Sequence, residues 1–209
     1  MAPTYDLAVG FSDLFRVEGD DEPPEPPERF EPPPWFGPSA DELGVHVSLN
    51  AIVGRSATGV VALSHAVAYS NGVTFELLAQ ARGLRGAQPN RIFHEQHIWQ
   101  IDPDELPDGF LRIGLELPDG TRVSNLSGRR NLDPQVRPSG SVLLQAGGGG
   151  GQSGDGLATM RPGFWLWPLP EAGVLRLSVE WPVVEIPLST IELGSAELLA
   201  AAARVLPLR

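Results

Sequence analysis

The chain has 209 residues, a formal net charge of −11 and 42% hydrophobic residues, which suits one domain with a sizeable core. It contains no cysteine, so disulfide bonds, thiolate metal ligands and cysteine nucleophiles are excluded. All 15 basic residues are arginine, and the 24 glycines and 21 prolines indicate a GC-rich bacterial genome. No apolar run reaches about 18 residues and the acidic N-terminus lacks the features of a signal peptide. We therefore expect a cytoplasmic protein that does not cross a membrane.

Most of the negative charge lies in the first part of the chain. Residues 1–44 carry eleven acidic residues and two arginines, a net charge of −9, whereas residues 45–209 carry 15 acidic residues and 13 arginines. Glu18–Pro34 is dense in Asp, Glu and Pro, and such a composition cannot bury enough apolar surface to offset chain entropy. We predict a disordered acidic arm over residues 1–34 and a single domain over residues 35–209. Because phosphate binding needs clustered cations, the charge disfavours a nucleic-acid partner.

Two parts of this arm carry apolar residues. Between Tyr5 and Val17 they recur at nearly helical spacing, which fits a frayed terminus, a short amphipathic helix or a docking peptide. Trp35 and Phe36 lie between prolines at the end of the arm. Two neighbouring large aromatic side chains there indicate a clasp onto the surface of the domain.

In three stretches at the start of the domain, inward and outward residues alternate as they do in half-buried strands. Val45–Val53 and Val73–Arg82 direct their odd-numbered apolar residues inward. Between them, Gly59–Tyr69 is apolar enough for burial on both sides, and its larger face comprises Val61, Leu63, His65, Val67 and Tyr69. Asn71-Gly72 predicts a tight hairpin with positive φ at both residues.

Further strands are predicted in the second half of the chain. Phe110–Leu117 and Thr121–Asn125 flank an Asp119-Gly120 turn, and Val142–Gln145 is short. Pro162–Pro182 holds three of the five tryptophans, and its prolines split it into two strands joined by a tight connection. The inward residues of its second strand, which anchor the core, are Leu175, Leu177, Val179 and Trp181.

The remaining stretches have weaker patterns. Gly83–Asp108 is polar and irregular, which predicts a long loop. Five consecutive glycines make Gly147–Gly156 a flexible connector. A proline makes Pro182–Gly194 a loop or an edge segment. Ser195–Leu206 is the one predicted helix, with its serine as the N-cap.

About eight short strands, two hairpin turns and one C-terminal helix predict an all-β fold. We expect an antiparallel two-sheet β-sandwich, and a small, partly open barrel is the alternative. The cysteine pair typical of immunoglobulin domains is absent.

Histidines provide the main candidates for chemistry. His94 and His97 lie in a dense polar cluster near Asp102 and Asp104, and imidazole with carboxylate can bind a metal. The two histidines are three residues apart, whereas the helical zinc-protease motif needs four. We therefore predict a solvated loop without metal or cofactor. His65, on the larger face of its strand, is predicted to be a core histidine bonded to a backbone carbonyl.

A glycine-flanked serine and a group of arginines are the other candidates for chemistry. Gly54–Gly59 nearly matches the serine nucleophile elbow, but it is one residue too long, and we predict a plain turn around Ser56. Several arginines could form a basic patch that binds anions, including the acidic arm of the chain itself. These are Arg82, Arg85, Arg91, Arg129 and Arg130.

Three hypotheses for the function remain. The first is a non-enzymatic β-sandwich that binds a protein partner, and its candidate binding residues are Trp35, Trp99, Arg129 and Arg130. The second is a small-molecule or carbohydrate binder that uses exposed tryptophans. The third is a metal-dependent hydrolase centred on His94 and His97. The exposure of Trp35, Trp99 and Trp165 separates the first two, because sugar stacking needs an exposed coplanar pair.

Overall fold

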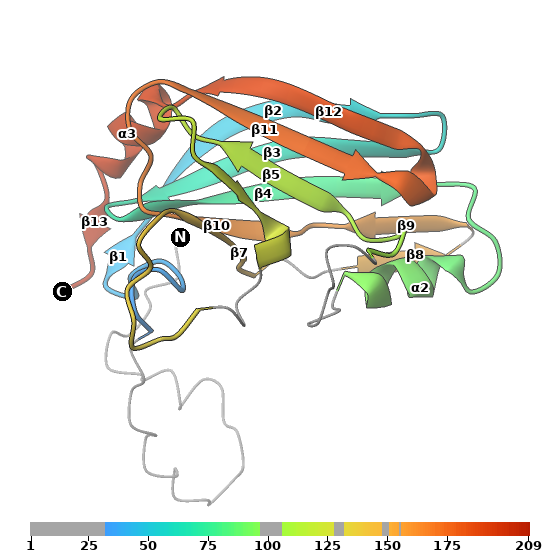
Figure 1. Ribbon diagram of the computed structural model, residues 1–209, viewed down its shortest axis with the longest axis horizontal. Helices are drawn as coiled ribbons and strands as arrows, with labels where there is room; N and C mark the ends of the chain where they lie inside the picture. The colour runs from blue at the N-terminus through green and yellow to red at the C-terminus, as the bar shows by residue number, and fades with distance from the viewer. Residues whose placement is uncertain (1–31, 97–105, 128–131, 148–150, 155) are drawn as a thin grey trace, which may run out of the picture. The chain divides into compact units, whose positions relative to one another are not determined.

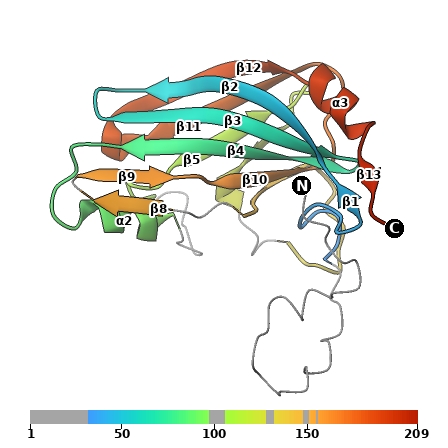
Figure 2. The ribbon, with the colours of Figure 1, turned by 180° about the vertical axis from the view of Figure 1, so that it is seen from behind.

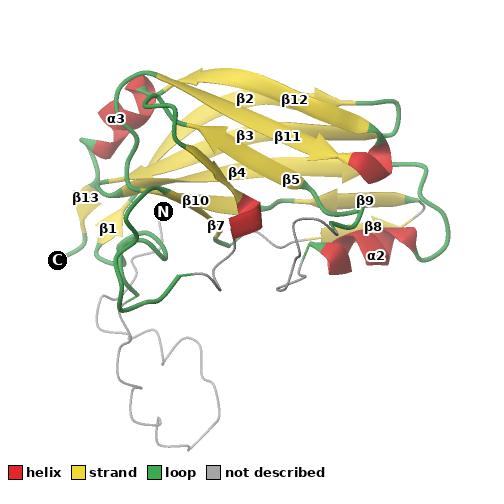
Figure 3. Ribbon diagram, in the orientation of Figure 1, coloured by secondary structure: helices red, strands yellow, loops and turns green. Residues whose placement is uncertain are grey.

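The computed structural model describes residues 32–96, 106–127, 132–147, 151–154 and 156–209. Nearly half of them lie in β-strands, and two α-helices accompany the strands (Figures 1 and 3). The strands form open antiparallel sheets, which confirms the prediction of a mostly β, antiparallel protein. The predicted disorder of the acidic arm falls almost wholly on residues 1–31, outside the described part of the chain.

Seven strands form the larger sheet. One edge of β4 pairs with β3, which in turn pairs with β2. The other edge pairs with β10 near the start of β4 and with β9 near its end. β7 pairs with β10, and β8 pairs with β9. The strands are β2 (Val45–Arg55), β3 (Gly59–Tyr69), β4 (Gly72–Ala81), β7 (Val142–Gln145), β8 (Gly151–Gly154), β9 (Leu157–Met160) and β10 (Gly163–Trp167).

A four-stranded sheet has the order β12-β11-β5-β6. Its strands are β5 (Arg112–Glu116), β6 (Arg122–Ser124), β11 (Val174–Trp181) and β12 (Ile186–Gly194). The remaining elements are a two-stranded sheet of β1 (Glu42–Leu43) and β13 (Leu206–Pro207), the helices α2 (Gln88–Glu95) and α3 (Ala196–Ala202), and the 3-10 turns η2 (Asn125–Ser127) and η4 (Pro182–Val184).

The two larger sheets contribute to one apolar core. Phe75 and Leu77 of β4 belong to the same buried cluster as Leu177 and Trp181 of β11. The two sheets are neighbours where β2 meets β11 and β12, and also where β6 meets β7. A Cβ at Gly54 of β2 would lie 2.6 Å from Cγ2 of Ile186, so a glycine is required for this approach.

A β-bulge in β3 changes which of its side chains face the core. The register moves from Leu63 opposite Leu77 to His65 opposite Glu76, which leaves Ser64 without a partner on β4. Residues after the bulge therefore point to the opposite face. Ala66 and Ala68 are fully buried, whereas His65 is on the outside, so the predicted single face from Val61 to Tyr69 and the core position of His65 were wrong.

The tight connection after β3 is also displaced from the prediction. Tyr69 pairs with Gly72, so the two-residue loop is Ser70-Asn71. Neither Asn71 nor Gly72 has a positive φ. Gly72 is needed for a different reason, because a Cβ there would lie 2.5 Å from Cη2 of Trp165.

The long stretch Gly83–Asp108 is not wholly irregular, because it contains α2. The helix buries Pro89, Ile92 and Glu95 on one side. At its end, the side-chain amide of Gln96 donates to the Gly109 carbonyl at 2.6 Å and accepts from the Leu111 amide at 3.2 Å. Short helices depend on such tertiary contacts, and the sequence pattern did not reveal them.

Two other stretches with weak sequence patterns form strands. Gly151–Gly154, within the predicted glycine connector, pairs as β8 with β9, because glycine retains the backbone groups that a strand needs. Pro182–Gly194 forms η4 and then β12, at the edge of the four-stranded sheet. The strands predicted in Pro162–Pro182 are β10 and β11, and they belong to different sheets.

The C-terminal helix is shorter than predicted. It ends at Ala202, and Leu206 pairs with Leu43 in the two-stranded sheet. Ser195 makes no capping bond. Its hydroxyl instead accepts from the Gly173 amide at 2.8 Å and donates to the Glu171 carbonyl at 2.9 Å, which fixes the connection between β10 and β11.

Leu177 tests the assignment of the core face. It is 1% exposed and lies between Leu115 and Ile191 on neighbouring strands. We expect Leu177→Ala to lower the free energy of unfolding by about 2–5 kcal/mol, since it leaves a cavity. Val174→Ala, on the same strand at 44% exposure, is the control and should cost less than about 0.5 kcal/mol. Equal small effects in urea denaturation would show that the face is misassigned.

Candidate functional site

The side of β2, β3 and β4 that points away from the core carries a mixed set of side chains, which we call the outer face. Residues paired across neighbouring strands share a face, and the pairing gives four rows across the three strands. The rows are His46, Val67 and Thr74; Ser48, His65 and Glu76; Ile52, Ala62 and Leu78; and Arg55, Val60 and Gln80. In Figure 2 these strands face the viewer, and no described helix or strand crosses in front of their middle.

Four charged or polar side chains gather on this face. The rings of His46 and His65 are stacked, with centroids 5.1 Å apart and planes 29° apart. Glu76 Oε1 lies 3.8 Å from His65 Nδ1 and 3.6 Å from Arg161 Nη1. His65 and Glu76 retain about a third of their side-chain exposure, at 30% and 31%. The cluster can therefore contact another molecule without any rearrangement of the backbone.

The geometry of this cluster does not match a metal site. Among the described residues, no group of three or more histidine, aspartate or glutamate side chains is placed to hold a metal ion. His94, a predicted candidate ligand, is exposed on α2, and His97 lies outside the described residues.

The predicted aromatic clasp is present at the β10 side of the same sheet. Trp165 Nε1 donates to the Pro34 carbonyl at 3.2 Å. Trp35 packs edge-on against Trp167, with ring centroids 5.9 Å apart and planes 63° apart. The guanidinium of Arg137 lies 5.2 Å from the Trp167 centroid, within range of a cation–π contact. Pro34, at the end of the predicted arm, and Trp35, at the start of the domain, therefore pack against this part of the sheet.

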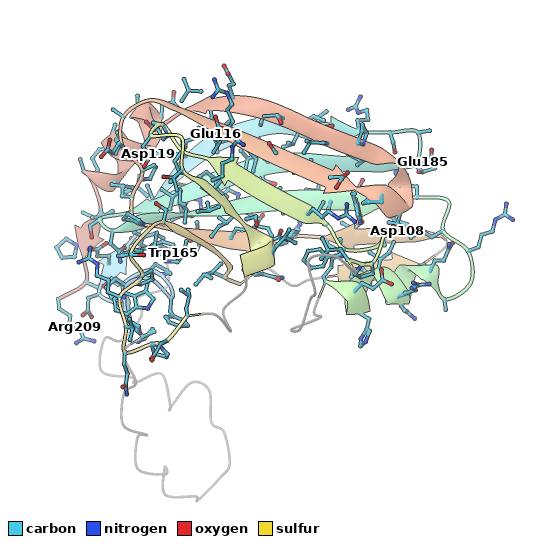
Figure 4. The ribbon with its side chains drawn as sticks, viewed as in Figure 1. Asp108, Glu116, Asp119, Trp165, Glu185 and Arg209 are labelled. Atoms are coloured by element: carbon cyan, nitrogen blue, oxygen red, sulfur yellow. The ribbon has the colours of Figure 1, made fainter. Side chains whose placement is uncertain are left out.

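The tryptophans do not form a platform for sugar stacking in the described part of the chain. Trp165, labelled in Figure 4, is fully buried. Its ring also meets that of Tyr69 edge-on, with centroids 5.8 Å apart. Burial, together with the nearby Glu42 carboxylate, raises the pKa of Tyr69. Trp99, Arg129 and Arg130 lie outside the described residues.

The opposite surface, on the four-stranded sheet, pairs its own charges. Glu116 accepts from Arg122 at 2.7 Å and from Arg176 at 2.8 Å, and Arg176 also donates to Glu192 at 3.0 Å. Hydrogen bonds from Arg122 and Arg176 lower the pKa of Glu116. The same bonding, with Glu116 and Glu192 as acceptors, raises the pKa of Arg176. A partner would have to compete with these pairs.

Ser56 is held as a turn residue and not as a nucleophile. Its hydroxyl accepts from the Gly59 amide at 2.9 Å and from the Thr58 amide at 3.2 Å, and it donates to the Val184 carbonyl. The predicted turn is therefore confirmed. These bonds tie the β2–β3 connection to η4.

Of the predicted basic patch, Arg82, Arg85 and Arg91 lie in the described part of the chain, whereas Arg129 and Arg130 do not. Arg91 is paired with Glu95 on α2, with Nε 2.5 Å from Oε1. Arg82 lines a hollow at the end of the outer face, where β2 turns into β3. Arg55, which sequence reasoning missed, lines the same hollow. Arg82 continues the outward alternation of β4. Arg55 does not continue that of β2, because it has the odd numbering of the inward residues and reaches the outer face only through the register shift between Ile52 and Gly54.

Comparisons of the chain with known protein families, with curated proteins and with solved structures gave no match. No helix in the described ranges has the length and apolar character that crossing a membrane requires. The site must therefore be interpreted from its own geometry.

The Glu116 ion pairs predict a pH dependence of stability. The folded-state pKa of Glu116 lies below its ordinary value of 4.5. Its contribution to the free energy of unfolding is therefore present above that pH, and it is lost as the pH falls through the folded-state pKa. We expect the melting temperature of Glu116→Gln to fall less than that of the parent between pH 6 and pH 3. Glu171→Gln, at an exposed position without an ion pair among the described residues, is the control. Parallel curves for all three proteins would contradict the prediction.

Proposed function

We propose that this chain is a non-enzymatic β-sandwich module that binds a protein partner through the outer face of β2, β3 and β4. The observation that carries the proposal is the arrangement of its rows. An apolar row, Ile52 with Ala62 and Leu78, lies between one polar row that holds His65 and Glu76 and another that holds Arg55 and Gln80. Protein interfaces have this organisation, with an apolar centre and a polar rim.

The character of the face favours a macromolecule over a small ligand. Small molecules bind mainly in concave pockets, whereas these rows follow extended strands, and Ile52 is 48% exposed at the end of the apolar row. Stacked imidazole rings add aromatic surface with polar edges, which suits a contact that is partly apolar and partly hydrogen-bonded. The self-paired charges of the four-stranded sheet favour the outer face over its counterpart.

The composition adds a cellular setting to the proposal. A chain without cysteine suits a reducing compartment, and the arginine, glycine and proline content suits a GC-rich bacterium. We therefore place the proposed module in a bacterial cytoplasm, with a protein as its partner and without a nucleic acid, a membrane or a cofactor.

Affinity capture with matched variants tests the proposal. Ile52→Glu puts a charge in the apolar row, and Leu188→Glu puts one on β12 of the other sheet, where Leu188 is 71% exposed. The parent protein and Leu188→Glu should capture the same partner from an extract of the source organism. Ile52→Glu should lose it, because burying an unpaired carboxylate opposes binding.

Purified components then make the test quantitative. With the captured partner in pure form, Ile52→Glu should weaken binding at least about tenfold, a change that central interface residues commonly produce. A photo-crosslinking residue at position 52 should form an adduct, and one at position 188 should not. Unchanged capture by a folded Ile52→Glu, or loss in Leu188→Glu alone, would refute the outer face as the binding surface.

A further inference from the structure

A hollow of about 260 Å³ lies where β2 turns into β3, next to the end of β4. It is lined by Arg55, Ser56, Ala57, Thr58, Gly59, Val60, Gln80 and Arg82. Three of these form the last row of the outer face. The lining therefore joins two arginines, a glutamine and two hydroxyl residues with the backbone of a tight turn.

The positive charge and most hydrogen-bond donors of these two arginines are available for binding. Within the described ranges no carboxylate forms an ion pair with Arg55 or Arg82, although six other arginines form such pairs. Arg82 Nη2 donates to Gln80 Oε1 at 3.3 Å, which uses one of the five N–H donors of a guanidinium. The remaining donors are available to an anion.

The backbone around the hollow is well fixed. The Ser56 hydroxyl bonds hold the turn closed and tie it to the Val184 carbonyl. The Arg82 amide donates to the Thr58 carbonyl at 2.7 Å, which joins the end of β4 to the same turn. The exposed side chains of both arginines therefore extend from a fixed backbone.

We propose that the hollow binds an oxyanion, a carboxylate or a phosphate, between the guanidinium groups of Arg55 and Arg82. The planar guanidinium donates two parallel hydrogen bonds to such groups. A water molecule occupies about 30 Å³, so the volume admits an oxyanion together with several waters. The chain as a whole carries a charge of −11, so binding of an anion needs a local site of this kind. The inference holds whether or not the outer face binds a protein.

Two-dimensional NMR of the isotope-labelled full chain tests the site. Inorganic phosphate and N-acetylglutamate are titrated separately at constant ionic strength, and the amide signals of Thr58 and Gly59 are followed. Saturable shifts are expected with at least one of the two. Tighter binding of N-acetylglutamate would identify the carboxylate of a protein as the natural ligand, and tighter binding of phosphate would identify free phosphate.

Variants establish where the anion binds. Arg55→Gln and Arg82→Gln, singly and together, should weaken binding at least tenfold while the melting temperature stays unchanged. Arg204→Gln, which removes an exposed arginine from beyond α3, should bind as the parent does. Shifts that stay linear up to high concentration with both anions, or shifts that persist in the folded double variant, would overturn the proposal.

Discussion

The bulge at Ser64 is the constraint on which both faces of the larger sheet depend. Side chains of a strand alternate strictly, so one inserted residue exchanges the faces of everything that follows it. Before the bulge, Val61 and Leu63 fill the core; after it, Ala66 and Ala68 do so. On β2 the register shifts at the same level, where Asn50 has a φ of 44°. The matched irregularities keep the two strands paired, and they place His65 outside, against His46 and Glu76.

The two larger sheets use their outward faces differently. On the four-stranded sheet, Glu116 and Arg176 belong to a network of ion pairs, and surface charges that neutralise one another leave little for a partner. On the outer face, the apolar row is flanked by the histidine stack on one side and by the arginine-lined hollow on the other. If the hollow receives a carboxylate of the partner, it would fix the direction in which that partner lies along the strands, because charged contacts determine register and specificity more than affinity.

Several parts of this structure could be predicted from the sequence. The alternation along β4 and β11 predicted their core residues correctly, Leu177 among them. The predicted contact of Trp35 with the domain is also present. The bulge could not be predicted, because Ser64 fits an uninterrupted alternation and only the pairing with β4 shows that it is extra. Helix α2 was hidden because its stability comes from contacts with residues as far along the chain as Gly109. The outer face was missed for the same reason, since three strands must be in register before its rows exist.

The absence of cysteine from the chain allows a direct measurement of the bulge. Single substitutions His65→Cys and Ala66→Cys, with Ser48→Cys as an exposed reference, are reacted with a thiol reagent under native conditions. The account predicts that cysteine at position 65 reacts at nearly the reference rate, and that cysteine at position 66 reacts only when the protein unfolds. Protection at position 65 with rapid reaction at position 66, as an uninterrupted alternation from Val61 would give, would contradict it.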